Sequence, residues 1–271
     1  MKKTLSLLAV LMVAGIATTP AQAATHYVSG IGGISWMNNV KYSAVYQQYN
    51  DPANQYNDAT GGGGNNFSSN FDLGSGLTLL GAVGCDYGSY RLEAEVGYQT
   101  NDVKSAADSW DGIPVTYYAD AAGTRLARYP IRGDVSVLSL MGNGYYDFDL
   151  GHKIELYAMA GVGVAQLSCH NMNWTEDWQQ DNESGPYILT SNNDPGFNAH
   201  ETTLAWQVGA GLAAPIADHV KLDLRYRYFA TTDFTLTDSG QSYEGDTFTG
   251  FYSNNTSLSS HSVLLGLRVD F

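Results

Sequence analysis

The chain has 271 residues, of which 44% are hydrophobic and only 15% are charged, well below the roughly 25% of typical soluble domains. Glycine (30 residues) and tyrosine (19 residues) are abundant, which excludes a disordered chain, a coiled coil and a bundle of membrane helices and favours an all-β protein. The formal net charge of -14 argues against nucleic acid as a partner, because nucleic-acid binding depends on basic patches.

Residues 1–23 have the three-part pattern of a secretory signal peptide. Two lysines near the start precede an apolar core over residues 5–17, and the small-residue sequence Ala21-Gln22-Ala23 follows. A membrane helix would need about 20 apolar residues, so we expect cleavage after Ala23 and export of the rest of the chain. No later stretch is long and apolar enough for a membrane helix, so any membrane crossing by residues 24–271 must use strands.

Windows of about ten residues alternate apolar and polar side chains, which is the pattern of a transmembrane barrel strand. The clearest window is 153–166, where Ile154, Leu156 and Ala158 share one apolar face. Windows 75–87 and 134–147 alternate less clearly, and either of their faces could point inward. In chain order the eight windows cover residues 27–37, 75–87, 89–100, 134–147, 153–166, 202–215, 219–231 and 262–271.

The connections between these windows alternate between short and long. Short ones lie near residues 87–89, 149–152 and 217–219, and the long ones cover 38–74, 101–133, 167–201 and 232–261. Long loops are uncommon in compact soluble domains, and a soluble lipocalin-like barrel would need polar outer faces. An up-and-down outer-membrane barrel has short periplasmic turns and long extracellular loops. We therefore predict one all-β domain, residues 24–271, that folds as an eight-stranded antiparallel up-and-down transmembrane β-barrel with four long extracellular loops.

The last window ends at an aromatic residue, Phe271. An alternating final strand with a terminal aromatic residue resembles the assembly signal of bacterial outer-membrane proteins. We therefore expect the C-terminal strand, through Phe271, to contact the barrel-assembly machinery.

Glycine-rich segments recur in the predicted strands, namely YRLEAEVGY (90–98), LYAMAGVGVAQL (156–167), AWQVGAGLAAPIADHVKLDLRYRYF (205–229) and HSVLLGLRVDF (261–271). These segments resemble the small porin-family surface antigens, the opacity-type outer-membrane β-barrels. The resemblance implies a surface-exposed barrel that serves as an antigen, an adhesin or a weak porin, and it transfers no catalytic residue and no cofactor. It also implies a place in the outer membrane of a Gram-negative-type bacterium, among outer-membrane lipids and lipopolysaccharide, with the loops facing outside.

Charged residues fall on the face opposite the apolar one in several windows. The interior of an eight-stranded barrel is just wide enough for side chains, and unpaired buried charges are costly. We therefore expect these groups to pair with one another in the lumen. A structural salt-bridge plug is one interpretation, and a narrow, gated ion path is the alternative. The residues are Arg91, Glu93, Glu95, Lys153, Glu155, Lys221, Asp223, Arg225, Arg227, Arg268 and Asp270.

Aromatic residues cluster toward the ends of the predicted strands. Rings with a polar edge favour the membrane interface, where one end is apolar and the other is wet. We interpret these residues as two girdles: Tyr27, Trp36, Tyr87, Tyr90, Tyr98, Tyr145, Tyr146, Tyr226, Tyr228, Phe229 and Phe271.

The predicted loops 167–201 and 232–261 contain acidic residues and no lysine or arginine. Such loops attract cations, including divalent ions that bridge lipopolysaccharide phosphates. A specific calcium loop is not indicated, because no EF-hand spacing is present. Cys85 and Cys169 are predicted at opposite ends of the barrel, too far apart for a disulfide, and a metal site at Cys169-His170 lacks further ligands at the right spacing.

The leading functional hypothesis is a barrel without catalytic activity that displays its loops for envelope integrity, adhesion or antigenic display, and whose loops bind a surface ligand. The alternative is a small porin that gives ions or small solutes a narrow, cation-preferring passage. An enzyme would need a nucleophile, a base and an orienting group within hydrogen-bond reach. His200-Glu201 and His261-Ser262 are the suggestive pairs, and neither lies in a catalytic motif.

Overall fold

The structure is a computed structural model, and it describes residues 24–46, 65–110, 113–114, 118–119, 124–128, 132–148, 154–182, 185–235, 240–241, 247–248 and 256–271. The predicted signal peptide, residues 1–23, lies outside these ranges. In the part of the chain that is described, no helix is long and apolar enough to cross a membrane.

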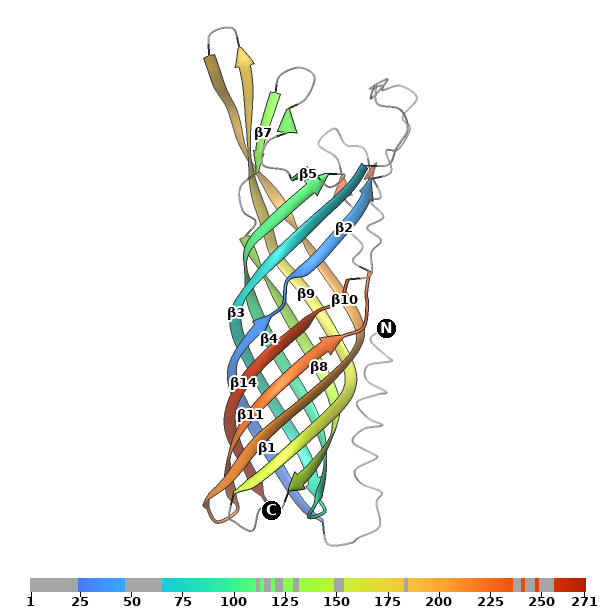
Figure 1. Ribbon diagram of the computed structural model, residues 1–271, viewed down its shortest axis with the longest axis vertical. Coiled ribbons are helices and arrows are strands. Elements are labelled where there is room, and N and C mark those ends of the chain that lie inside the picture. The colour runs from blue at the N-terminus through green and yellow to red at the C-terminus, as the bar shows by residue number, and fades with distance from the viewer. Residues whose placement is uncertain are drawn as a thin grey trace.

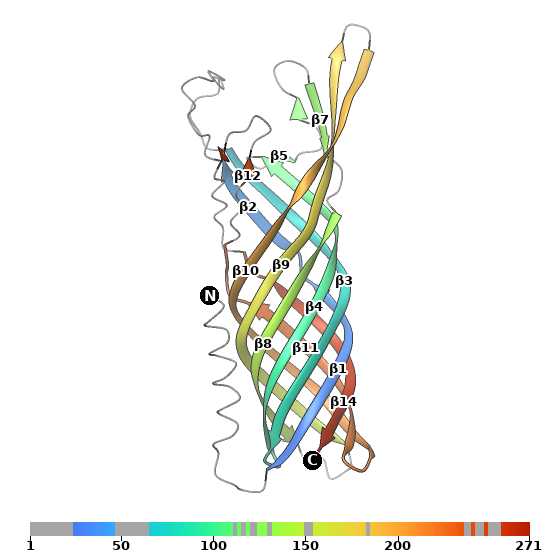
Figure 2. The same cartoon turned by 180° about the vertical axis from the view of Figure 1, so that it is seen from behind.

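Long antiparallel strands form a closed barrel (Figures 1 and 2). The first strand pairs with the last, from Tyr27 opposite Asp270 to Met37 opposite Ser260, so no sheet edge remains free around the barrel wall. The eight barrel strands are β1 (Thr25–Met37), β3 (Asn65–Asp86), β4 (Tyr90–Trp110), β8 (Arg132–Phe148), β9 (Glu155–Asn182), β10 (Gly185–Ala217), β11 (Val220–Thr231) and β14 (Ser259–Asp270). This arrangement confirms the predicted eight-stranded up-and-down fold.

One end of the barrel, the turn end, carries the short connections. In the β3–β4 turn Gly88 has a φ of 93°, and its backbone N–H donates to the Asp86 carboxylate at 2.8 Å. In the β10–β11 turn His219 has a φ of 63°, which is uncommon for a residue with a Cβ atom. Phe271 lies at this end, where its backbone N–H donates to the His26 carbonyl at 2.8 Å. The predicted turn at 149–152 lies outside the described residues.

The opposite end, the loop end, extends farther than the sequence indicates. Residues 167–182 and 185–201, which the alternation assigns to a long loop, are strand, and β9 and β10 continue past the barrel as a two-stranded ribbon (Figures 1 and 2). Beyond the lipid both faces of a strand are wet, so apolar residues no longer need to alternate. The shorter strands at this end are β2 (Val40–Tyr46), β5 (Ile113–Pro114), β6 (Tyr118–Ala119), β7 (Thr124–Arg128), β12 (Gly240–Gln241) and β13 (Thr247–Phe248).

The outer wall of the barrel is an apolar belt. Large apolar side chains face outward on every barrel strand, and Ile34 and Leu265 are each 54% exposed. The belt ends toward the loop end, where Leu138 on β8 gives way to Ser136 and Val164 on β9 gives way to Gln166. Exposed apolar surface of this extent indicates contact with lipid or another apolar partner.

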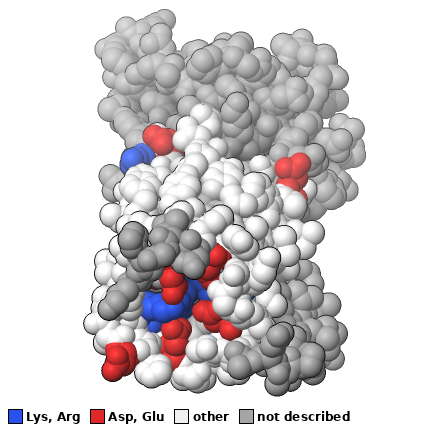
Figure 3. Space-filling view, turned by 60° about the horizontal axis from the view of Figure 1, so that its bottom comes forward, with Lys and Arg blue, Asp and Glu red and all other residues white. Residues whose placement is uncertain are grey.

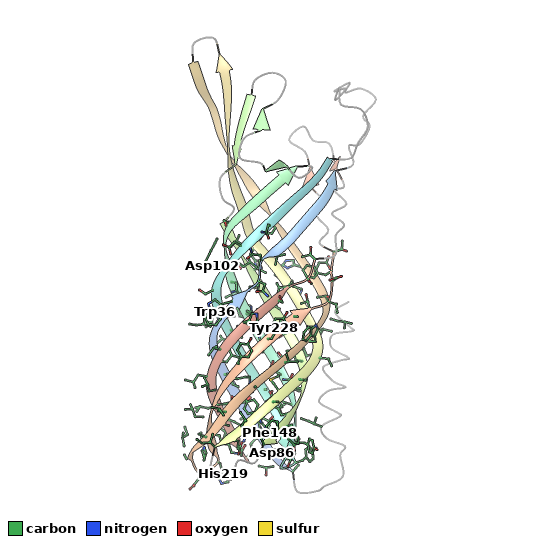
Figure 4. All side chains as sticks on the ribbon, in the orientation of Figure 1. Trp36, Asp86, Asp102, Phe148, His219 and Tyr228 are labelled. Carbon is green, nitrogen blue, oxygen red and sulfur yellow. The ribbon has the colours of Figure 1, made fainter. Side chains whose placement is uncertain are left out.

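Aromatic side chains border this belt at both ends, but three of the predicted girdle residues lie elsewhere. Trp36 and Tyr228 lie toward the loop end and Phe148 toward the turn end (Figure 4). Tyr27, Tyr145 and Phe229 are buried in the lumen, so their assignment to a girdle is wrong. The reason is the alternation itself: Tyr145 and Tyr146 are consecutive, and only one of them can face outward.

Candidate functional site

The lumen is filled by large side chains that stand beside glycines. A Cβ atom on Gly84 would lie 2.3 Å from the ring of Tyr27, and one on Gly211 would lie 2.3 Å from the Tyr157 hydroxyl. Because eight strands leave only enough width for side chains, each large inward residue requires a small neighbour. This requirement accounts for part of the glycine and tyrosine content of the chain.

Glu95 on β4 is the centre of a buried charge cluster. Its carboxylate lies 3.2 Å from the Arg225 guanidinium and 3.7 Å from that of Arg227, both on β11. Gln207 on β10 donates a further hydrogen bond to Glu95 at 3.0 Å. These contacts join β4 to β10 and β11 across the lumen.

Glu93, two residues earlier on the same face of β4, is satisfied mainly by neutral donors. Its carboxylate accepts hydrogen bonds from the hydroxyls of Tyr27 and Tyr145 and, at 3.1 Å, from the side-chain amide of Asn143. The Arg225 guanidinium lies 4.0 Å away. Both buried carboxylates on β4 therefore have hydrogen-bond partners, as groups in a low-dielectric interior require.

Arg91 forms a second buried pair nearer the turn end. Its Nε and Nη2 atoms each donate to an oxygen of Asp147 on β8 at 2.7 Å, a two-pronged geometry that carboxylates favour. Its guanidinium also lies 4.4 Å from the centre of the Tyr145 ring and 4.9 Å from that of Tyr157. We call Arg91, Glu93, Glu95, Asp147, Asp223, Arg225 and Arg227 the lumen network, in which all side chains are buried except that of Asp147, which is 11% exposed.

Four further charged residues form the mouth cluster at the turn end of the lumen, and its centre is cationic in Figure 3. Arg268 donates to Glu155 at 2.7 Å, and Lys221 also pairs with Glu155. Asp270 lies 3.6 Å from Lys221 and 3.4 Å from Arg268. The side chains of Lys221 and Glu155 keep 19% and 32% of their exposure, so this cluster meets solvent.

Ten of the eleven charged residues that the sequence places in the lumen lie on the inner face, and Lys153 is outside the described residues. The sequence analysis missed the neutral partners Asn143 and Gln207 and the anion Asp147. Asn143, Tyr145 and Asp147 share one face of β8, so the alternation could have found them. It does not single them out, because either face of window 134–147 could point inward.

The loop-end half of the lumen contains apolar residues, which the sequence analysis did not predict. We call this group the apolar layer. Its members come from β1, β3, β4, β8, β9, β10 and β11 and from the β11–β14 connection. They are Met37, Leu73, Val103, Val135, Val137, Met141, Ala165, Leu167, Cys169, Ala205, Phe229, Phe234 and Leu258.

Two histidines lie at the loop-end rim, above the belt. His170 lies 3.4 Å from the Asp134 carboxylate, and His200 is hydrogen-bonded to the Ser168 hydroxyl at 2.8 Å. The hydroxyl and the carboxylate thus contact different imidazoles, and a nucleophile–base–acid chain is not formed there. Each imidazole with its partner spans neighbouring strands.

The predicted pair His261-Ser262 is not brought together. Ser262 is buried in the lumen, whereas His261 lies on the outer wall, 2.6 Å from the Tyr226 hydroxyl. Among the described residues there is no group of three or more His, Cys, Asp or Glu side chains placed to hold a metal ion.

Both cysteines are free and buried, at opposite ends of the barrel. The Cys85 sulfur lies 3.3 Å from Nδ1 of His26 near the turn end. Cys169 belongs to the apolar layer, beyond the loop-end limit of the belt. Burial, and secondarily the Asp134 carboxylate, raises the pKa of the Cys169 thiol to about 11.

Comparison with known proteins gives one family and several distant relatives. The family described as the outer membrane protein beta-barrel domain matches residues 6–271. The outer membrane protein PagN of Salmonella typhimurium is 25% identical over 198 residues, which are 70% of this chain and 71% of that protein. RC1281 of Rickettsia conorii, whose name describes it as a candidate adhesin, is 25% identical over 213 residues, 76% of this chain and 72% of that protein. The crystal structure of Neisserial surface protein A aligns with 91% of this chain and 97% of its own, at 15% identity and a TM-score of 0.39.

Proposed function

Because the chain belongs to the outer membrane protein beta-barrel domain family, we propose that it displays its loop-end segments at the cell surface and catalyses no reaction. Its place is the outer membrane, where lipid surrounds the apolar belt. The tasks of the displayed segments are adhesion, antigenic display or envelope integrity. The observation that carries this proposal is the contrast between a filled lumen and a β9–β10 ribbon that continues beyond the barrel.

The ribbon supports display because it continues directly from two strands of the barrel wall. Its two strands pair from Glu155 opposite Ala213 in the wall to Asn182 opposite Gly185 at the tip, with register shifts after Ile188, Asp194 and Phe197. Residues of β7 add a third strand, from Thr124 opposite Gln180 to Arg128 opposite Glu176. Loop segments on a rigid scaffold are where binding residues concentrate. The naming of RC1281 as a candidate adhesin is consistent with this use.

Absence of catalysis is supported by the arrangement of the rim. Among the described residues, His200 contacts a hydroxyl and His170 contacts a carboxylate, but no imidazole contacts both. Within the described ranges, the buried charged groups belong to the lumen network or, in the case of Arg268, to the mouth cluster at the turn end, away from the displayed segments. A proteolysis or esterase assay with the refolded protein should therefore give the background rate.

The porin alternative is favoured by the acidic loops and disfavoured by the packing of the lumen. Glu95 is fully buried and Arg225 is 1% exposed, so their side chains and partners fill the lumen at this level. We expect the refolded protein in a planar bilayer to be electrically silent. Discrete cation-selective steps that change in Glu95→Gln would instead support the porin.

The C-terminal strand supplies a second contact. Phe271 is 71% exposed at the turn end of β14, where a periplasmic partner can reach it. We therefore assign it to the barrel-assembly machinery. Phe271→Ser should lower the amount of protein assembled in cells while leaving refolding of the purified protein in detergent unchanged.

Adhesion is tested by moving the protein to a non-adherent bacterium. The full chain should increase binding of the bacterium to host cells, and a variant whose residues 171–198 are replaced by a short turn should lose that gain. A matched variant shortened within residues 236–255 separates the ribbon from the neighbouring connection. Surface antibody binding and the heat-dependent gel shift of a folded barrel verify display of each variant.

Two results would contradict the proposal. One is a ribbon epitope that antibodies cannot reach on intact cells. The other is a full chain that, although folded and displayed, changes neither adhesion, antibody recognition nor the resistance of the envelope to detergent.

A further inference from the structure

Two members of the apolar layer do not belong to the barrel wall. Phe234 follows β11 and Leu258 precedes β14, so both come from the connection between these strands. They are only 9% and 1% exposed. The connection therefore turns inward at its base, and its apolar side chains pack against the inward side chains of the surrounding strands.

Backbone hydrogen bonds hold the two legs of this connection together. The Thr231 N–H donates to the Leu258 carbonyl at 2.9 Å, and the Leu258 N–H donates to the Thr231 hydroxyl at 3.0 Å. Farther out, the Phe234 N–H donates to the Thr256 carbonyl at 2.9 Å, and the Thr256 N–H donates to the Phe234 carbonyl at 3.1 Å. A hydrogen-bonded pair of legs has a defined position, unlike an open loop.

The legs are also fastened to the wall on either side. The Thr232 N–H donates to the Leu204 carbonyl of β10 at 2.9 Å, and the Asn38 N–H donates to the Ser259 carbonyl at 2.9 Å. The side-chain amide of Asn38 donates to the Ser259 hydroxyl at 2.8 Å. The base of the connection is thus held to β10 on one side and to the end of β1 on the other, the strands that neighbour β11 and β14.

We propose that residues 231–234 and 256–258 form a cap that seals the loop end of the lumen against water. The cap closes over the apolar layer, and the buried polar side chains at the same level, Ser35, Gln99, Asn101 and Ser260, are hydrogen-bonded to one another. Few polar atoms there are left to bind water, which needs two to four partners to enter a buried space. Toward the turn end this space meets the lumen network at Gln99, whose side-chain oxygen accepts a hydrogen bond from Arg227 at 3.3 Å.

The cap makes the two ends of the lumen different. Below the apolar layer, the Arg227 guanidinium lies 5.2 Å from the centre of the Phe229 ring, which marks where the charged part begins. At the far end the mouth cluster is partly exposed. The lumen is therefore open to solvent at the turn end and closed at the loop end.

Cys169 is a native reporter of this seal, since it lies in the apolar layer and is one of only two cysteines. We would replace Cys85 by serine, refold the protein in lipid vesicles and follow the reaction of Cys169 with a water-soluble maleimide at pH 7.5. The sealed protein should react at least about tenfold more slowly than the urea-unfolded chain, because the reaction requires local opening. Leu258→Ala should raise the rate about tenfold by loosening the cap.

The matched control is Leu265→Ala, which removes the same atoms from an outward leucine of β14 and should leave the rate unchanged. If Leu258→Ala does not fold, Thr231→Val replaces it, because this variant keeps the size of the side chain and removes only the hydroxyl that accepts from Leu258.

A folded parent protein whose Cys169 reacts as fast as the unfolded chain would overturn the cap. Equal rates in the cap variant and in Leu265→Ala would also overturn it. Neither result bears on display by the ribbon, so failure of the cap and failure of the proposed function remain distinguishable.

Discussion

The two halves of the lumen fill the same narrow space in opposite ways. In the turn-end half, Glu95 and Arg225 are almost completely buried and are held by each other and by Gln207, Asn143 and Tyr157. In the loop-end half the apolar layer needs no partner atoms beyond close packing. A buried charge stabilises the protein only while every partner is present. Truncating a buried apolar side chain instead lowers the stability of the protein in proportion to the volume removed. The charged half should therefore respond sharply to single changes and the apolar half gradually.

The largest effect is expected for Arg225→Ala. This change leaves Glu93, Glu95 and Asp223 without their shared cation, which should lower the free energy of unfolding by about 3–5 kcal/mol. Arg225→Lys should rescue little, because a lysine cannot reproduce the forked contacts of a guanidinium. Urea unfolding of the refolded protein measures both, with the outward Leu224→Ala as the control. A loss no larger than that of the control would break the comparison.

A smaller, graded effect is expected in the apolar half. Leu258→Ala should cost roughly 2–4 kcal/mol through the cavity it leaves, whereas Leu258→Met should cost less than about 1.5 kcal/mol, because it conserves volume. The same urea titration measures the pair. If Leu258→Met were as damaging as Arg225→Lys, the apolar layer would be as intolerant as the lumen network.

The fit of the charged half can be tested without touching a charge. Gly211→Ala forces a methyl group against the Tyr157 hydroxyl and should cost about 1–3 kcal/mol by overpacking. Gly30→Ala is the matched control, because nothing lies within 4 Å of the position its methyl group would take. Similar stability of the two variants would show that the lumen can yield, contrary to its packed appearance.

The smallest effect is expected outside both halves, at the β10–β11 turn. His219 has a left-handed backbone conformation that glycine adopts without strain. His219→Gly should therefore stabilise the fold by less than about 1 kcal/mol. A clear destabilisation would mean that the imidazole makes a contact that matters more than the backbone.

The sequence predicted the wall of the barrel well because lipid enforces a simple rule there. All eight predicted windows agree with a strand to within two residues at the turn end. The alternation of apolar and polar side chains is lost where no lipid contacts the strand. Beyond the apolar belt, residues 167–182 and 185–201 do not alternate apolar and polar side chains, so their strands could not be told from a loop.

The rule also fails where the lumen itself is apolar. Val137 belongs to the apolar layer while its neighbour Leu138 faces outward. Leu80 is likewise buried in the lumen while its neighbour Leu79 faces outward. Both faces of windows 75–87 and 134–147 therefore contain apolar residues, which is why their orientation could not be assigned. Charged residues such as Glu93 and Arg225 could be assigned to the lumen, because a charged side chain on the lipid-facing side of these strands would be costly.

The length of the ribbon sets how far from the membrane its tip is held. The 14 residues that follow Ser168 in β9, at about 3.3 Å each, make roughly 45 Å of strand. In the outer membrane, lipopolysaccharide molecules would surround a ribbon of that length. Contact between the ribbon and another cell would then depend on the length of the surrounding sugar chains. Short chains would leave the tip of the ribbon accessible, and long chains would cover it without any change in the protein.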